Sequence, residues 1–110
     1  MDSTRQKKVS RLLQKELGQI LQLKSNELGG KMITVTIVRV SPDLSLAKVY
    51  LSIFPHKKDE DVLLPLKEHS SQIRHELGNR VRHQLRIIPE LAFFVDDSLD
   101  YIENIENLLK

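Results

Sequence analysis

The chain has 110 residues, about the size of one domain, which gives room for a single hydrophobic core but not for two. Its 40% apolar and 29% charged residues are typical of globular proteins, and no apolar run approaches the roughly 18 residues of a membrane span. The N-terminus lacks the apolar core of a signal peptide, and without cysteine the chain has no disulfide or thiolate chemistry. We therefore expect a cytoplasmic protein with one domain, residues 1–110.

Charge is distributed unevenly along the sequence, although the formal net charge is only +2. Residues 1–31 contain seven Lys or Arg and three acids, whereas residues 96–110 contain five acids and a single lysine. A basic body with an acidic tail indicates a polyanionic partner, with the tail turned away from it. The alternative is a solvated surface on which charges alternate by chance.

The first predicted element is an amphipathic helix over Thr4–Leu23. Its apolar residues recur at steps of three and four and form one stripe: Val9, Leu12, Leu13, Leu17, Ile20 and Leu21. Four cations fall largely outside that stripe: Lys7, Lys8, Arg11 and Lys15. Ser3 or Thr4 can cap the start, and Gly29-Gly30 favours backbone angles that end a helix.

Two strands follow and form a predicted antiparallel hairpin. Residues 33–40 are almost all β-branched, and strict alternation places Ile33, Val35, Ile37 and Arg39 on one face. The same alternation places Thr34, Thr36, Val38 and Val40 on the other face. Ser41-Pro42-Asp43 predicts a turn in which Asp43 bonds its own backbone, and Leu46–Phe54 alternates as a second strand.

The second half of the chain predicts a long helix, a strand and a last helix. After a polar loop over Pro55–Asp61, the helix begins near Leu64 or Pro65 and ends before Pro89. Its apolar face consists of Leu66, Ile73, Leu77, Val81 and Leu85. Leu91–Val95 is apolar at nearly every position, which predicts a central strand. Ser98 can then cap an acidic C-terminal helix within residues 97–110.

This order of elements indicates the α+β class, with helices over one face of a small sheet. No internal repeat, low-complexity segment or interdomain linker interrupts the order.

The long helix carries the strongest candidate binding site. Arg74, Gly78, Arg82 and Arg86 form a four-residue row beside the apolar face, with Arg80 nearby, and Glu76 is the only acid between Arg74 and Arg86. Arginine suits phosphate because its planar donors match phosphate oxygens in pairs, and Gly78 leaves space for a phosphate at the backbone. The alternative is that Gly78 allows close helix packing while the arginines pair with nearby acids.

The sequence contains no residue pattern typical of a catalytic or metal-binding site. His69, His75 and His83 are not spaced three or four residues apart, and no HExxH sequence is present. The carboxylate groups at Asp59-Glu60-Asp61 and Asp96-Asp97 are better explained by capping and solubility than by acid–base work. We therefore predict no catalytic residue, no metal and no cofactor. The few aromatic residues also do not form a pattern for stacking single-stranded bases on a sheet.

Three segments resemble the bacterial ribosome-binding factor A family. They are RQKKVSRLLQKELGQIL at Arg5–Leu21, SPDLSLAKVYLSIF at Ser41–Phe54, and IRHELGNRVRHQLRIIPELAFFVDDSL at Ile73–Leu99. The segment at Ser41–Phe54 is similar to the family's DL-x-x-AKVY hairpin, and the run PELAFFVDDS is rather specific. Together the similar segments span nearly the whole chain.

The resemblance implies a type II KH-like fold, in the order helix, strand, strand, helix, helix, strand, with a C-terminal helix added here. It also implies a non-enzymatic factor that binds the small (30S) ribosomal subunit during late maturation and acts on 16S rRNA processing, notably in cold growth. A ribosome-associated GTPase is the implied agent of release, no membrane is involved, and we expect a monomer.

The chain departs from the family pattern at two places. The family bends its helix pair at an Ala-x-Gly kink, and the corresponding residues here are His69, Ser70 and Ser71. Ser side chains can divert backbone hydrogen bonds, so these three residues are the expected helix kink. Ser25-Asn26-Glu27 stands where the family usually has Asp-Pro-Arg, which removes one expected basic contact.

The arginine row and the family resemblance together predict a ribosome assembly factor. We expect it to recognise mainly the phosphate backbone and the shape of the rRNA. The predicted RNA-binding residues are Arg74, Arg80, Arg82 and Arg86, aided by Lys7, Lys8, Arg11 and Lys15. The rival hypothesis is a protein-interaction module whose basic helix binds an acidic protein.

Overall fold

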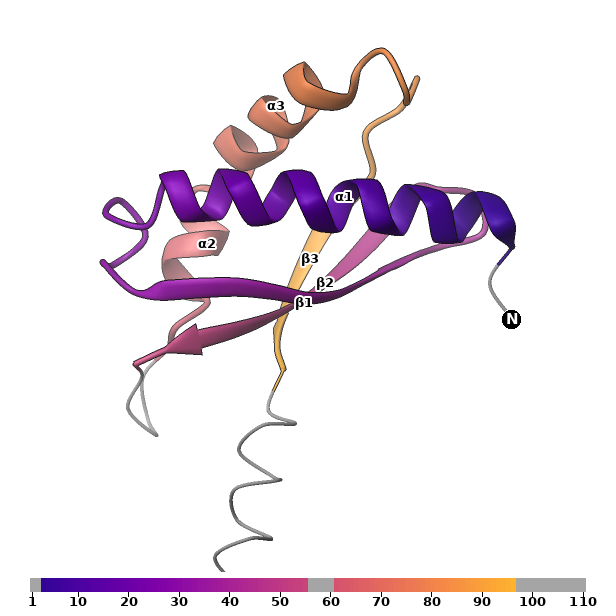
Figure 1. Cartoon of the computed structure of the whole chain (residues 1–110). Coiled ribbons are helices and arrows are strands. Elements are labelled where there is room, and N and C mark those ends of the chain that lie inside the picture. The colour runs from indigo at the N-terminus through magenta and orange to yellow at the C-terminus, as the bar shows by residue number, and fades with distance from the viewer. Residues whose placement is uncertain (1–2, 56–60, 97–110) are drawn as a thin grey trace, which may run out of the picture.

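The computed structural model describes residues 3–55 and 61–96, and its order of elements agrees with the predicted order (Figure 1). The elements are α1 (Thr4–Leu23), β1 (Met32–Val40), β2 (Leu46–Phe54), α2 (Leu64–Glu68), α3 (Ser70–Val81) and β3 (Glu90–Val95). The predicted C-terminal helix from Ser98, the acidic tail and the acids Asp59 and Glu60 lie outside the described residues. In the part that is described, no helix is long and apolar enough to cross a membrane.

Local chemistry explains the start of α1 and the turn that follows the helix. Ser3 accepts a hydrogen bond from the Gln6 backbone N–H at 3.1 Å, and the Gln6 side chain accepts one from the Ser3 N–H at 2.8 Å. This reciprocal capping box satisfies two of the free donors that begin every helix. Beyond the other end, Gly29 and Gly30 adopt positive φ angles of 100° and 71°, which glycine alone reaches without a steric penalty.

The sheet has the order β1-β2-β3, with β1 antiparallel and β3 parallel to β2. The prediction of a central strand at Leu91–Val95 is therefore wrong, because β3 lies at an edge and β2 is central. The apolar residues of β3 have partners on both faces without a further strand. Phe93 is buried in the core, while Phe94 stacks on Tyr50 of β2 with ring centroids 5.3 Å apart.

A β-bulge corrects the predicted faces of β1. Val35 pairs with Leu51 and Ile37 with Tyr50, so Thr36 is one extra residue in this strand. The extra residue reverses the alternation beyond it: Val38 and Val40 are buried with the core, whereas Ile37 and Arg39 are exposed on the other face. The Thr36 hydroxyl donates to Asp96 Oδ2 at 2.6 Å and approaches the Tyr50 carbonyl oxygen at 3.1 Å.

The core lies between the helices and one face of the sheet. In Figure 1, α1 runs along that face and α3 lies on the same side. The largest fully buried side chains come from α1, β2 and the helix pair: Leu13, Leu17, Ile20, Leu21, Leu51, Leu66, Ile73 and Leu77. The opposite face carries no helix of the described residues, which leaves Ile37 and Phe94 partly exposed there.

The helix expected to reach Pro89 ends instead at Val81. The backbone N–H groups of Gln84 and Leu85 both donate to the Val81 carbonyl oxygen, which closes the last turn. The parallel pairing of β3 gives the physical reason: the Glu90 N–H bonds to the Ser45 carbonyl oxygen at 2.9 Å. The chain must leave the helix axis before Pro89 to reach that position. Arg82, the C-cap of α3 with helical angles, still lies in line with Arg74 and Gly78, whereas Arg86 falls beyond the helix and does not continue that row.

Candidate nucleic-acid interface

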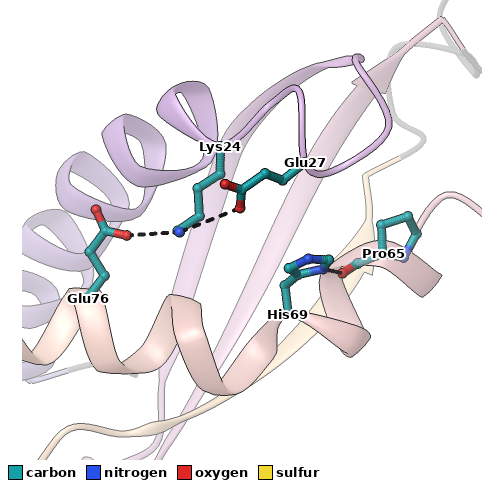
Figure 2. Close-up of polar contacts among 5 residues, drawn as sticks. All are labelled: Lys24, Glu27, Pro65, His69 and Glu76. Atoms are coloured by element: carbon teal, nitrogen blue, oxygen red, sulfur yellow. Dashed lines mark hydrogen bonds and ion pairs between the residues drawn. The ribbon is translucent and has the colours of Figure 1, made fainter.

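The predicted kink residues lie at the junction of α2 and α3. His69 separates the two helices with φ −100° and ψ 10°, and Ser70 and Ser71 are the first two residues of α3. His69 Nδ1 lies 2.9 Å from the Pro65 carbonyl oxygen, a contact that ties the junction to the first turn of α2 (Figure 2). The change of helix direction therefore falls on a half-buried histidine.

A groove of about 730 Å³ lies between α3 and the segment that leads into β3. Its α3 wall carries polar and basic side chains at helical spacing: Ser70, Ser71, Arg74, His75, Asn79 and Arg82. Ile88, Glu90 and Leu91 form the other wall. Apart from the carboxylate of Glu90, the lining combines hydroxyl, amide, imidazole and guanidinium groups, whose donors suit phosphate or ribose oxygens.

Arg74 holds this groove together. Its Nη2 donates to the Ile88 carbonyl oxygen at 2.7 Å, and its Nε donates to that of Pro89 at 3.2 Å. The guanidinium thus satisfies two carbonyl groups of the irregular segment and fixes it against α3. Arg74 shapes the groove and presents only its remaining donors to a ligand.

Gly78 lies in the same groove, packed beside Ile88. A Cβ added at Gly78 would lie 3.5 Å from Ile88 Cγ1, an ordinary van der Waals contact. Of the two hypotheses for this glycine, close packing has this direct observation in its favour. The packing neighbour is the segment before β3 rather than another helix.

Arg80 joins α3 to α1. Its Nη1 lies 3.2 Å from Glu16 Oε2 in an ion pair and 2.9 Å from Gln19 Oε1 in a hydrogen bond. A second ion pair links α3 to the C-cap of α1, since Lys24 Nζ lies 3.3 Å from Glu76 Oε2 (Figure 2). The same Nζ lies 3.8 Å from Glu27 Oε2. Arg80 therefore finds its acid on α1, which the linear sequence does not indicate.

Arg82 and Arg86 are exposed, and no hydrogen bond or ion pair within residues 3–55 and 61–96 engages either guanidinium. Arg82 lines the groove beside α3. Arg86 lines a separate hollow together with Arg5 and Lys8 of α1, two residues more than 75 positions earlier in the chain. These two arginines thus line different sites.

The four predicted cations of α1 are exposed: Lys7, Lys8, Arg11 and Lys15. Lys8, Arg11 and Lys15 follow one another at steps of three and four, so they form a row on the outer side of the helix. Lys8 joins this row to the hollow that contains Arg86, and Lys15 borders a further hollow next to β1.

Arg5 is a candidate residue that the sequence reasoning missed. It is exposed, lies three residues before Lys8 on α1 and shares the hollow with Lys8 and Arg86. Its spacing from Lys8 was the available signal, but the neighbouring Arg86 could not be read from the sequence.

The turn between β1 and β2 borders the same hollow through Asp43. The Asp43 carboxylate accepts hydrogen bonds from the Ser41 hydroxyl, the Ser45 hydroxyl and the Ser45 N–H, at 2.7, 2.8 and 3.1 Å. The Ser41 bond, followed by the bonds from Ser45, lowers the pKa of this carboxyl below its ordinary value. Asp43 is therefore ionised at neutral pH and engaged by its own turn, as the turn prediction required.

The histidines and carboxylates do not converge on a metal site in the part of the chain that the structure describes. His75 lines the groove beside α3, and His83 is exposed in the turn after that helix. The described geometry thus presents cations and hydrogen-bond donors rather than an assembled set of metal ligands.

Comparison with known proteins identifies a family that matches nearly the whole chain. The family model described as ribosome-binding factor A matches residues 5–109. The ribosome-binding factor A of Christiangramia forsetii is 52% identical over 99% of this chain and 85% of its own length.

Two sets of coordinates for relatives extend the agreement to the fold. The crystal structure of ribosome-binding factor A from Thermus thermophilus has a TM-score of 0.68 at 27% identity, covering 82% of this chain and 94% of its own. A homology model of the T. thermophilus ribosome binding factor A, fitted into a cryo-EM map of a 30S–RbfA complex, has a TM-score of 0.63 at 28% identity and covers 78% of this chain and 89% of its own. The helix–strand–strand–helix–helix–strand order is the KH-like fold of these structures. The chain belongs to the ribosome-binding factor A family.

Proposed function

We propose that this protein is a non-enzymatic assembly factor that binds the small ribosomal subunit through the backbone of 16S rRNA. The observation that carries the proposal is the set of exposed cations without partners in the described residues, on α1 and after α3: Lys7, Lys8, Arg11, Lys15, Arg82 and Arg86. Phosphate is the ligand that such a set suits best. The T. thermophilus relative fitted into a 30S complex supports the choice of partner.

The predicted arginines have different roles in this proposal. Arg82 and Arg86 contact phosphate directly, since their donors are free of bonds to described residues. Arg74 positions the wall of the groove through Ile88 and Pro89. Arg80 contributes mainly by joining α3 to α1, and His69, Ser70 and Ser71 set the direction in which α3 presents the groove.

The finer parts of the proposal rest on family membership. They are action in the cytoplasm as a monomer during late maturation and processing of the 16S rRNA 5′ end. They also include release by a ribosome-associated GTPase and a greater need for the factor in the cold.

Co-sedimentation with purified small subunits tests the proposed site. The double variant R82E/R86E is expected to lose binding, because it places two carboxylates against the phosphates that Arg82 and Arg86 are proposed to contact. The matched control is R39E/K48E, which changes the net charge equally on the paired strands β1 and β2, on the face opposite the core. We expect this control to retain most of the binding, and circular dichroism to report both variants as folded.

Two outcomes would contradict the proposal. Unchanged co-sedimentation of R82E/R86E would remove the site assignment, and equal losses in both variants would mean that net charge alone decides binding. Light nuclease treatment of the subunits separates the rival hypothesis. Binding that survives loss of exposed rRNA would favour a protein-interaction module on an acidic protein.

A further inference from the structure

The start of α1, the β1–β2 turn and the segment after α3 meet around one hollow of about 490 Å³. Three exposed cations line it, Arg5, Lys8 and Arg86, against a single carboxylate, Asp43. No ion pair joins Asp43 to these cations in the described residues, and its oxygen Oδ1 is occupied by Ser41 and Ser45. The hollow therefore keeps an excess of positive charge that is available to a ligand.

Ile87 borders this hollow with 73% of its surface exposed. Its neighbours Leu85 and Ile88 pack against the core, and Arg74 bonds the carbonyl oxygens of Ile88 and Pro89. The segment is thus held on both sides of Ile87, which fixes the side chain outward. A large apolar residue held in water beside three cations loses the favourable free energy of burial, and a ligand that covers it would restore that free energy.

The ligand must offer phosphate to the cations and an apolar surface to Ile87. Helical RNA offers both at its minor groove, which is wide and shallow in the A form. There the C–H groups of the riboses, beside their 2′-hydroxyls, lie between two phosphate backbones. The minor groove of B-form DNA is narrower and deeper, so an isoleucine beside phosphate-bound cations reaches its sugars less readily.

We propose that this hollow binds helical RNA, with Arg5, Lys8 and Arg86 on phosphates and Ile87 against riboses in the minor groove. The inference rests on the proposed function, since it names the form of RNA that one part of the surface takes. It adds Arg5 and Ile87 to the binding residues and separates this hollow from the groove beside α3.

Fluorescence anisotropy with a short RNA hairpin tests the inference. The variant Ile87→Ser is expected to weaken hairpin binding about 5- to 10-fold, the equivalent of one lost apolar contact. The matched control is Leu23→Ser, because Leu23 is also 73% exposed but lies at the other end of α1, roughly 27 Å from Arg5 along the axis. The control is expected to bind within about twofold of the unchanged protein.

A second pair of variants tests the phosphate contact proposed for Arg5. Arg5→Gln is expected to make the slope of log affinity against log salt concentration shallower by the amount of about one phosphate contact. Lys67 is an exposed lysine of α2, and Lys67→Gln should leave that slope unchanged. Hairpin binding by Ile87→Ser at the level of the unchanged protein would overturn the inference. An equal loss on a single strand or on a DNA duplex of the same sequence would also overturn it.

The co-sedimentation and hairpin measurements together separate this inference from the proposed function. If R82E/R86E loses binding to small subunits while Ile87→Ser and Arg5→Gln bind the hairpin normally, the inference fails and the proposed function stands. If R82E/R86E also binds small subunits normally, the proposed function fails.

Discussion

The arginines of this protein differ most in what their guanidinium groups already contact. Arg74 donates to two backbone carbonyl groups and Arg80 to a carboxylate and an amide, so much of their donor capacity is used within the fold. Arg82 and Arg86 have no such contacts in the described residues. An arginine with free planar donors can bind phosphate without breaking an internal bond, so we propose direct phosphate contacts for these two.

Asp43 gives a prediction at the same scale. Its pKa is lowered in the folded protein by bonds from Ser41 and Ser45, so the carboxylate stabilises the fold above its unfolded pKa of about 3.9. That stabilisation is lost as the pH falls through the lower, folded pKa. Urea unfolding of the unchanged protein and Asp43→Asn should therefore differ more at about pH 7 than at about pH 2.5. A difference that does not shrink in acid would contradict the role of the charge.

At the scale of elements, α1 and α3 form one surface because ion pairs and core packing join them. Arg80→Gln removes the pair with Glu16, whose side chain is 18% exposed, and should destabilise the fold by about 1 kcal/mol. Affinity for small subunits should change little, since Arg80 acts through the helix contact. Urea unfolding measures the first effect and co-sedimentation the second, with Lys67→Gln as the control. A large loss of affinity with unchanged stability would place Arg80 among the direct contacts.

The elements that the sequence predicted well have strong local signals. The run of β-branched residues, the turn around Asp43 and the apolar stripe of α1 predicted the hairpin and the first helix. The bulge at Thr36 was missed because one extra β-branched residue does not disturb the local pattern. The end of α3 was missed because Leu85 continues the four-residue apolar spacing, although it packs from the turn beyond the helix.

The candidate site was harder to predict than the fold. The exposed cations could be named from helical spacing, but their grouping depends on tertiary contacts between distant segments. Arg5 and Arg86 meet only because α3 ends at Val81 and its following segment returns past the start of α1. The partner of Arg80 likewise comes from 64 residues away.

At the scale of the whole molecule, the central claim is that the exposed cations without partners in the described residues contact rRNA phosphates. They are the cations of α1 and of the segment after α3: Lys7, Lys8, Arg11, Lys15, Arg82 and Arg86. Each phosphate contact releases counterions, so the logarithm of the association constant should fall linearly with the logarithm of the salt concentration. The opposite face carries Arg39 and Lys48, which provide a matched pair of cations that the account does not assign to rRNA.

The most direct measurement is this salt dependence for small-subunit binding between about 50 and 200 mM salt. R82Q/R86Q should have a slope shallower by about 1.5, the effect of two lost phosphate contacts, while R39Q/K48Q keeps the slope of the unchanged protein. A flat response of the unchanged protein, or equal slopes for it and R82Q/R86Q, would contradict the account.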